Sequence, residues 1–375
     1  MNILLVSWHV PAVGMTSGGL KRTYEIIKRI PRNTNVIVID TQPSFLRDLK
    51  ADNIHFVEYK IPSFIKILER RAFVLERGLE WLWAMGAIIV SGLRNRKRVD
   101  VIYVPFSEML VVSIAAYVVK LVSRKPTVFC NLNASPYGID IQIRAFLHQR
   151  VDKVITVSNS LKEALKAQGI TENVVVNTVG LDSELASRID DCPKQYDAIF
   201  IGRHTKEKGI FDLVKAVGAI TESRPDFRLL SLGSCSPPVK LRLQKELEQA
   251  KLEDNFIYGG VVSEIDKFEA IKNSRLCMFL SYQEGWGIVP LEALACGVPV
   301  VAYDLPAYQE NIKPCEAVLL TATGAWQEAA KKVIHILQLS DKDYLALGSL
   351  GKEFVKQFGW EEIAERELQL LRSII

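Results

Sequence analysis

The chain has 375 residues, of which 49% are hydrophobic and 24% charged, and its formal net charge is +4. This length favours two domains, and the composition is typical of a folded globular protein and excludes a disordered one. Six cysteines lie apart without a CxxC pair or a histidine cluster, so neither a zinc site nor a disulfide framework is expected.

The start of the chain, MNILLVSW, reads as a short strand and lacks the basic and long apolar regions of a signal peptide. The longest apolar runs are too short to span a bilayer. We therefore expect a cytoplasmic protein that can associate peripherally with the inner face of the membrane.

Strands and helices alternate along the first half. Strands are predicted near 3–7, 36–40, 54–59, 101–104, 127–131, 153–157 and 174–177, and helices near 20–30, 64–89, 109–122 and 160–168. Such alternation predicts a parallel sheet with helices on both faces. Gly18 and Gly19 precede the first helix, where backbone can approach a diphosphate, although paired glycines usually mark only a turn. Lys21 and Arg22 at the helix start oppose its dipole unless an anion is present.

Residues 61–98 combine positive charge with an apolar stripe. They contain eight Lys or Arg and three acidic residues, and apolar residues recur at helical spacing. With Trp81 and Trp83, this pattern is typical of an interfacial helix on an anionic membrane surface, but a helix packed on its own sheet shows the same stripe. Nucleic acid is not an expected partner, because no aromatic platform or binding module accompanies the charges.

A polar stretch at 183–196 is predicted to be a linker, and the alternation then resumes. Strands are expected near 197–202, 228–233 and 256–259, and helices near 210–221, 239–251 and 265–273. The whole pattern predicts an α/β fold of two Rossmann-like domains facing across a cleft, which is a common place for ligand sites.

Two loops of the second half carry candidate site residues. In FIGRHTKEKGIFDLVKA (200–216), Arg203 and Lys208 stand between a strand and a helix N-terminus, which together favour an anion. In SYQEGWGIVPLEALACGVPVVAY (281–303), seven residues separate Glu284 from Glu292 across a strand-to-helix turn. Carboxylates can accept hydrogen bonds from diols, and the free N–H groups of 285–288 suit a phosphate. A nucleotide-sugar would match these groups.

The segments GRHTKEKG (202–209) and EGWGIVPLEALACGVPVVA (284–302) resemble the donor-binding signatures of family four retaining glycosyltransferases with the GT-B fold. Weaker similarities cover almost the whole chain, among them SGG (17–19), VITVSNSLKEAL (154–165), NTVGLD (177–182) and FIYGGVVS (256–263). The tail FGWEEIAERELQLLRSI (358–374) resembles the family's last helix, which crosses back onto the N-terminal domain. The resemblance implies an acceptor domain at 1–182, a donor domain at 197–355 and a crossover helix at 356–375.

By matching position, the resemblance implies a role for each site residue. Arg203 and Lys208 would neutralise the donor diphosphate, Glu284 would bind hydroxyls of the transferred sugar, and Glu292 would bind the ribose diol. Further donor contacts are implied for backbone groups, at Gly18, Gly19, Val261, Val262, Gly285, Trp286, Gly287 and Ile288. The family's chemistry implies retention at the anomeric carbon, with a donor phosphate oxygen as the base. No cofactor is expected beyond the nucleotide-diphosphate sugar, which is a co-substrate.

One position departs from the family. Many members carry a histidine facing the sugar, whereas this chain reads FCNLNASPYG (129–138), with Asn131 and Asn133 on the acceptor or sugar side. Asparagine can donate a hydrogen bond to a hydroxyl or phosphate but cannot carry charge, so either it takes over the hydrogen bond or activity is reduced. No metal is expected, since the only DxD, at 341–343, precedes a helix as a capping turn.

These patterns predict a retaining glycosyltransferase that moves a sugar from a nucleotide-diphosphate sugar to a carbohydrate or lipid-linked acceptor, such as an envelope polysaccharide precursor. The alternative is a nucleotide-sugar-binding subunit with little turnover, which the missing histidine suggests. A dinucleotide-dependent oxidoreductase is excluded, because no GxGxxG follows any strand.

Overall fold

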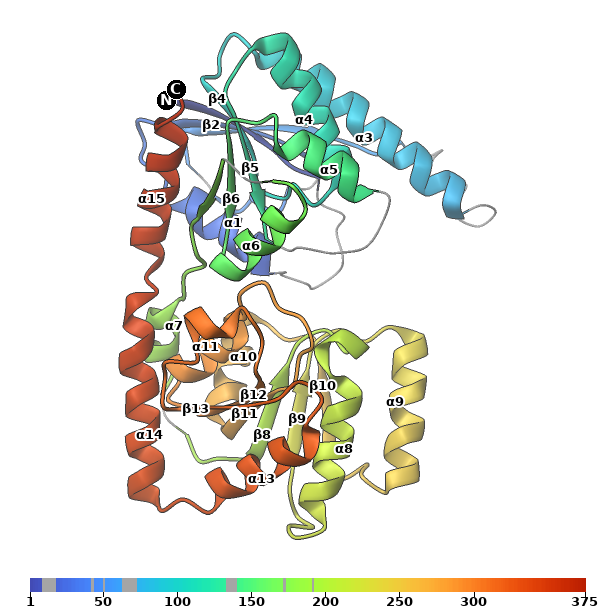
Figure 1. The fold of residues 1–375 in the computed structure, drawn as a ribbon, viewed down its shortest axis with the longest axis vertical. Coiled ribbons are helices and arrows are strands. Elements are labelled where there is room, and N and C mark those ends of the chain that lie inside the picture. The colour runs from blue at the N-terminus through green and yellow to red at the C-terminus, as the bar shows by residue number, and fades with distance from the viewer. Residues whose placement is uncertain are drawn as a thin grey trace. The chain divides into compact units, whose positions relative to one another are not determined.

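A computed structural model of the chain describes residues 1–8, 18–41, 44–49, 51–62, 73–132, 140–170, 173–190 and 192–375, without the side chains of 73–77 and 140. The chain divides into two compact units, one formed by Met1–Val179 with Trp360–Ile375 and one by Gly180–Gly359. Each unit is built on a parallel sheet with helices packed on it, which confirms the predicted α/β class (Figure 1).

The first unit contains a seven-stranded sheet in the order β3-β2-β1-β4-β5-β6-β7. Its strands are β1 (Asn2–Val6), β2 (Asn35–Thr41), β3 (Ile54–Tyr59), β4 (Val101–Val104), β5 (Thr127–Asn131), β6 (Lys153–Thr156) and β7 (Val174–Val176). The central strand β1 pairs with β2 on one side and β4 on the other, so that Leu4 lies opposite Ile37 and Ile102. The strands are nearly continuous apolar runs because helices cover both faces of the sheet.

The described helices of this unit are α1 (Gly18–Lys28), α3 (Phe73–Asn95), α4 (Leu110–Ser123), α5 (Asp140–His148), α6 (Asn159–Ala167) and α15 (Trp360–Arg372). Successive residues of β1 point to opposite faces. Leu4 joins a core with residues of α3, α4 and α5, whereas Leu5 joins a second core with residues of α1 and α15. The C-terminal helix α15 therefore completes the first unit, although it follows the second unit in sequence.

Several helix boundaries of this unit differ from the sequence prediction. Helix α1 begins at Gly18 and ends at Lys28, two residues earlier than expected at each end, so Gly18 and Gly19 lie within it. Helix α3 continues to Asn95 rather than ending near 89, and the predicted part at 64–72 lies outside the described residues. Helix α6 begins at Asn159, because the Ser158 hydroxyl accepts a hydrogen bond from the Leu161 N–H at 3.1 Å and caps the helix there.

The second unit contains a six-stranded sheet in the order β10-β9-β8-β11-β12-β13. Its strands are β8 (Tyr196–Ile201), β9 (Leu229–Leu232), β10 (Phe256–Gly260), β11 (Ser274–Phe279), β12 (Val300–Tyr303) and β13 (Val318–Thr321). Its α-helices are α7 (Ser183–Arg188), α8 (Ile210–Thr221), α9 (Pro237–Ala250), α10 (Glu264–Lys272), α11 (Ile288–Ala295), α12 (Tyr308–Asn311), α13 (Trp326–Leu337) and α14 (Asp341–Phe354). Short 3-10 helices lie at Lys206–Lys208 and Val355–Gln357.

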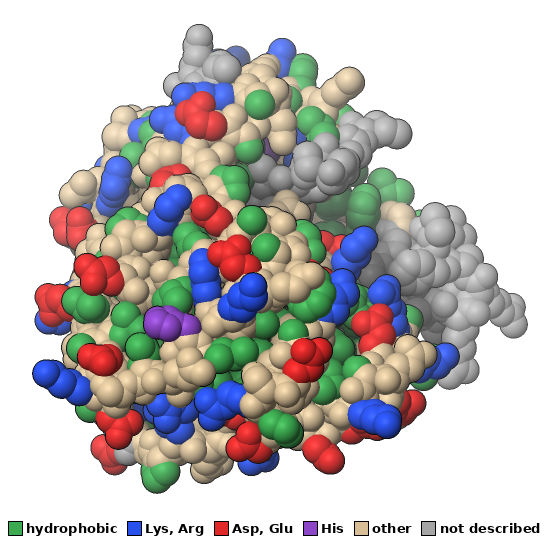
Figure 2. Space-filling view, turned by 60° about the horizontal axis from the view of Figure 1, so that its bottom comes forward, with side chains coloured by type: hydrophobic (Ala, Val, Ile, Leu, Met, Phe, Trp, Pro, Cys, Tyr) green, Lys and Arg blue, Asp and Glu red, His purple; other side chains and the backbone are tan. Residues whose placement is uncertain are grey.

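The stretch predicted as a linker, 183–196, contains the helix α7. The Asp182 carboxylate caps this helix by accepting a hydrogen bond from the Leu185 N–H at 3.0 Å. On the face of the molecule shown in Figure 2, Lys and Arg side chains are interspersed with Asp and Glu, so no field of a single sign covers that face.

Candidate functional site

The strand order of the second unit creates one crevice at the carboxyl edge of its sheet. The chain passes from β8 outward to β9 and β10, and then returns to place β11 on the opposite side of β8. Ligands of open α/β sheets bind where the order reverses in this way. The loops that follow β8 and β11, at 202–209 and 280–287, are therefore neighbours, and they contain the residues singled out from the sequence.

The loop after β8 is anchored by His204, which is fully buried. Its Nε2 lies 2.6 Å from the Ser231 hydroxyl, and its ring packs edge-on against Phe200 and Tyr258. Burial lowers the pKa of His204 to about 4, so the imidazole is neutral near pH 7. The neighbouring Arg203 is exposed and free to face solvent or a ligand.

Gly209 allows this loop to pass close to the next one. Its φ is +71°, and a Cβ at this position would lie 1.8 Å from the backbone oxygen of Leu280. Only glycine fits both the left-handed backbone and this separation. The helix α8 then begins at Ile210, two residues after Lys208.

Lys208 and Glu284 form an ion pair across the two loops, although they are 76 positions apart in sequence. Their side chains are 19% and 11% exposed, so the pair is largely shielded from solvent. An ammonium and a carboxylate in contact can serve the two halves of a nucleotide-sugar, because one attracts phosphate and the other accepts sugar hydroxyls.

The loop after β11 leads into α11 through Gly287, whose φ of +85° starts the helix without a side-chain cap. A Cβ at Gly287 would lie 2.6 Å from the Tyr308 ring. The Trp286 side chain is buried against Phe358, at a ring distance of 6.0 Å. Only the backbone of Trp286 is therefore placed to meet a ligand. The helix ends at Ala295, and Gly297, two residues later, has a φ of +71°.

Glu292 lies on α11 and is only 1% exposed. Its carboxylate accepts a hydrogen bond from the Lys267 ammonium at 2.8 Å, and Lys267 also pairs with Glu264 at 2.9 Å. A ribose could reach this carboxylate only if Lys267 moved or shared it. Sequence reasoning did not find Lys267, because a plain helical lysine acquires this partner only when α10 packs beside α11.

The two valines expected near a base follow β10. Val261 is 46% exposed and Val262 is 36% exposed, so both are open to solvent. They lie at the same sheet edge as the loops after β8 and β11, since β10 runs parallel to β9 and β9 to β8.

Gly285 lies in the loop after β11, and Ile288 is the first residue of α11. The other predicted site residues belong to the first unit. Gly19 has a packing explanation, because a Cβ there would lie 2.7 Å from the Leu132 side chain and 3.0 Å from the Phe106 ring. Gly18 is the first residue of α1. Asn131 ends β5 and is 2% exposed. Asn133 lies outside the described residues.

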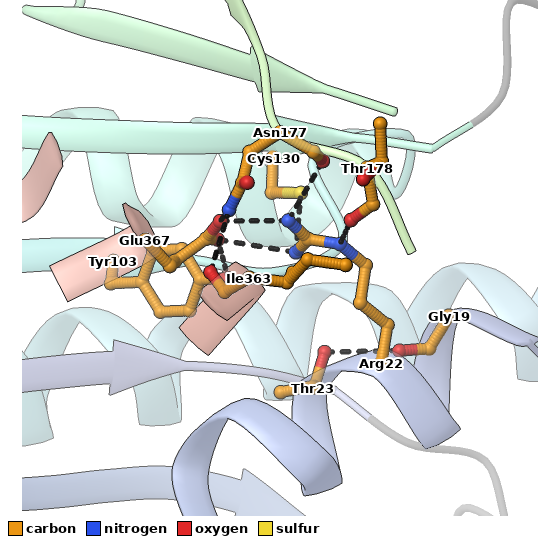
Figure 3. A network of polar contacts seen from close by, with 9 residues as sticks. All are labelled: Gly19, Arg22, Thr23, Tyr103, Cys130, Asn177, Thr178, Ile363 and Glu367. Atoms are coloured by element: carbon orange, nitrogen blue, oxygen red, sulfur yellow. Dashed lines mark hydrogen bonds and ion pairs between the residues drawn. The ribbon is translucent and has the colours of Figure 1, made fainter. Parts of the chain in front are cut away.

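The first unit also contains a buried ion pair that the sequence did not reveal (Figure 3). Arg22 on α1 donates to both oxygens of Glu367 on α15, at 3.1 and 2.7 Å. Its other N–H groups meet the backbone oxygens of Asn177 and Thr178, each at 3.1 Å, and the Cys130 sulfur at 3.5 Å. All five guanidinium donors are thus used.

This contact corrects the expectation that Arg22 signals a bound anion. The anion is Glu367 of the same chain, and it also accepts hydrogen bonds from the Tyr103 hydroxyl at 2.7 Å and from Asn177 Nδ2 at 2.5 Å. Burial opposes ionisation of Glu367, but Arg22 and the hydrogen bonds outweigh it and lower the pKa of the carboxyl. Arg22 is therefore structural.

The described residues contain no group of three or more His, Cys, Asp or Glu side chains placed to hold a metal ion. The DxD at 341–343 forms the first turn of α14, where the Ser340 hydroxyl accepts a hydrogen bond from the Asp343 N–H at 3.2 Å. The capping residue is therefore Ser340, and the DxD lies within the helix rather than before it.

The fold as a whole is that of the GT-B glycosyltransferases. The crystal structure of HepE from Anabaena in complex with UDP-glucose matches 100% of this chain and 100% of its own, with a TM-score of 0.80 and 18% sequence identity. Residues 186–353 match the family described as glycosyl transferases group 1. This match lies within the second unit and confirms the resemblance seen in the two donor-loop motifs.

Curated relatives agree with this assignment. The D-inositol 3-phosphate glycosyltransferase of Paenarthrobacter aurescens is 28% identical over 188 residues, which are 49% of this chain and 45% of the relative. The phosphatidyl-myo-inositol mannosyltransferase of Mycobacterium tuberculosis is 25% identical over 236 residues, which are 61% of each chain. The chain spans about half the length of the curated relatives it matches.

Proposed function

We propose that this protein is a glycosyltransferase that takes a sugar from a nucleoside-diphosphate sugar and transfers it to an acceptor hydroxyl. The observation that carries the proposal is the contact between Lys208 and Glu284 at the crevice between β8 and β11, in a unit that matches glycosyl transferases group 1. The HepE structure, a complex with UDP-glucose, supports a nucleotide-sugar as the class of donor.

In this proposal each charged group has a distinct task. Lys208 and the exposed Arg203 neutralise the diphosphate as it leaves, and the N-terminus of α11 adds its N–H groups. Glu284 orients the sugar through its hydroxyls. These cations supply the charge that a metal supplies in other enzymes, so the reaction proceeds without a metal.

The reaction retains the configuration of the anomeric carbon. The acceptor oxygen attacks from the face that the leaving group vacates, and a phosphate oxygen of the donor takes the acceptor proton. The acceptor–carbon bond forms as the carbon–phosphate oxygen bond breaks, and the nucleoside diphosphate departs with the proton. This route needs no carboxylate nucleophile, which fits the pairing of Glu284 with Lys208.

A transfer assay with variants in the same loops tests the proposal. With a panel of UDP- and GDP-sugars, we expect Lys208→Ala and Glu284→Gln to lower kcat/KM by about 100-fold or more. Lys206→Ala, in the same loop but exposed, and Glu316→Gln, at an exposed site, serve as matched controls and should stay within about threefold of wild type. Equal rates in all four variants would contradict the proposed site.

The second candidate is a nucleotide-sugar-binding subunit with little turnover. It is favoured by Asn131, which stands where many members of the family have histidine and is almost fully buried. Calorimetric binding of UDP or GDP without release of nucleoside diphosphate from any donor, over hours and with varied acceptors, would support this alternative. Proton NMR of the product would give the anomeric configuration if transfer occurs.

We also propose a lipid-linked acceptor at a membrane surface. On α3, Trp81, Leu82 and Trp83 are 46%, 60% and 44% exposed, and the cations at 94–98 follow near its C-terminal end. Exposed apolar and aromatic side chains, with Lys and Arg further along the same segment, suit an anionic bilayer surface. The name of the mycobacterial relative includes a phosphoinositide lipid, which agrees with an acceptor of this kind. No helix among the described residues is long and apolar enough to cross a membrane.

Liposome flotation tests this part of the proposal by itself. Binding to anionic vesicles at low salt should fall at least about fivefold when Leu82 is changed to Glu or when the 94–98 cations are changed to Gln. Leu345→Glu is the matched control, because Leu345 is 67% exposed on α14 in the other unit. If the three variants and the wild type float equally, α3 does not bind the membrane, and its apolar stripe serves only to pack the helix on its own sheet.

A further inference from the structure

The donor loops are held together by contacts that do not themselves face a ligand. The Tyr282 N–H donates to the Glu207 backbone oxygen at 2.8 Å, and the Ser281 hydroxyl donates to the same oxygen at 3.2 Å. These bonds join the loop that carries Lys208 to the loop that carries Glu284.

Asp212 adds a side-chain link between the same segments. It lies in the first turn of α8, and its Oδ2 accepts hydrogen bonds from the Tyr282 hydroxyl at 2.5 Å and from the Tyr303 hydroxyl at 2.7 Å. Lys215 pairs with its other oxygen at 3.1 Å. The two tyrosine rings pack edge-to-face, with centroids 5.5 Å apart.

The charge state of this cluster is consistent with a stable link. Burial opposes ionisation of Asp212, but the hydrogen bonds from Tyr282, Tyr303 and Lys215 outweigh it and lower the pKa of the carboxyl. The same hydrogen bond, followed by burial, raises the pKa of Tyr282 to about 12. Asp212 is therefore an ionised acceptor and Tyr282 a neutral donor across the neutral range, and charge-assisted hydrogen bonds of this kind are strong.

The position of the cluster relates it to the donor site. Asp212 lies four residues after Lys208, and Tyr282 lies two residues before Glu284. Tyr303 differs from Tyr282, because it belongs to β12, which is fixed by pairing with both β11 and β13. Loss of the Tyr282 hydroxyl would loosen the loop that bears Glu284, leaving the two bonds to the Glu207 backbone oxygen to hold it. Loss of the Tyr303 hydroxyl would leave the link between Asp212 and Tyr282 in place.

We infer that Asp212 and Tyr282 are positioning residues that set the separation of Lys208 and Glu284, and so the fit of the donor's phosphate and sugar. The inference rests on the proposed function and deepens it. Neither residue is proposed to contact the substrate. Both act through Lys208 and Glu284, which are proposed to contact the donor.

The tyrosine pair gives a matched test, since each Phe variant removes one hydroxyl from the same carboxylate. We expect Tyr282→Phe to lower kcat/KM for the nucleotide-sugar by about tenfold, because loosened catalytic groups lose alignment. Tyr303→Phe should stay within about threefold, although its Tm should fall at least as far, because Tyr303 is fully buried and Tyr282 is 43% exposed. Asp212→Asn, which keeps an acceptor oxygen, should recover part of the rate that Asp212→Ala loses.

Binding of UDP and GDP to the wild type, measured by calorimetry, separates the two proposals. If neither nucleotide binds and no donor is turned over, the proposed function fails and the inference falls with it. If the wild type is active, the tyrosine pair alone decides: equal rate losses in both Phe variants, a larger loss in Tyr303→Phe, or no loss beyond threefold in Tyr282→Phe would each overturn the positioning role. A rate loss confined to Tyr282→Phe, with no greater loss of Tm, supports it.

Discussion

The buried pair of Arg22 and Glu367 should determine whether the C-terminal helix stays attached to the first unit. Both side chains are at most 1% exposed, and the pair joins α1 to α15. Removing one partner leaves the other as an uncompensated charge in the core, which typically costs about 3–5 kcal/mol. We therefore expect Arg22→Met to lower the free energy of opening of α15 by about that amount.

The double variant Arg22→Met with Glu367→Gln distinguishes charge from packing. The neutral amide keeps an oxygen for Tyr103 or Asn177 and leaves no buried ion, so this variant should be more stable than either single change. Neighbours in one network couple, and we expect a coupling energy of at least about 2 kcal/mol. Glu367→Gln alone should resemble Arg22→Met, since the guanidinium is then the unpaired charge.

Native-state hydrogen exchange of the α15 amides measures this opening directly, and the amides of α8 in the other unit serve as the internal reference. A change of less than about 1 kcal/mol in the free energy of opening of α15 in Arg22→Met, or an equal change in α8, would contradict this expectation. Acid gives a second check. The folded pKa of Glu367 lies below its unfolded value near 4.3, so the contribution of the pair is complete above that pH and is lost as pH falls through the folded pKa.

Two further predictions concern the second unit. Gly209→Ala should destabilise this unit by more than about 4 kcal/mol, because the new Cβ would collide with the Leu280 backbone oxygen. Gly260 has the same φ of +71° but open space around it, so Gly260→Ala should cost only about 1–2 kcal/mol. Urea unfolding of both variants measures the two losses, and similar values would show that backbone strain alone matters. Because Arg203 and Lys208 are proposed to neutralise the diphosphate, excess EDTA should leave donor turnover within about twofold of the untreated enzyme. A large loss of turnover that is reversed by adding Mg²⁺ or Mn²⁺ would contradict metal-independent transfer.

Much of the fold could be predicted from local patterns. Alternating apolar runs and amphipathic segments predicted strands such as β8 and helices such as α8, because sheet strands covered on both faces must be apolar throughout. The glycine-rich turns before α8 and α11 could also be predicted from residue type alone. Gly209 and Gly287 both have positive φ, which other residues rarely adopt.

Partners across long sequence separations were not visible. Lys267 looks like an ordinary helical lysine, and nothing near it in sequence indicates Glu292. Arg22 was interpreted as a sign of a bound anion, because the carboxylate that satisfies it lies 345 positions away. Tyr282 likewise gives no local sign of Asp212, which is 70 positions earlier.

The sequence by itself determined the α/β class, the two donor-loop motifs and their resemblance to a glycosyltransferase family. These depend on local periodicity and on residue types at fixed spacing, which the chain carries without any tertiary contact. Only the tertiary structure decided that Lys208 meets Glu284, that Lys267 pairs with Glu292, and that Arg22 is held by Glu367. The physical reason is that burial and ion pairing arise between segments that the parallel sheets bring together, and β8 and β11 become neighbours only when the sheet forms.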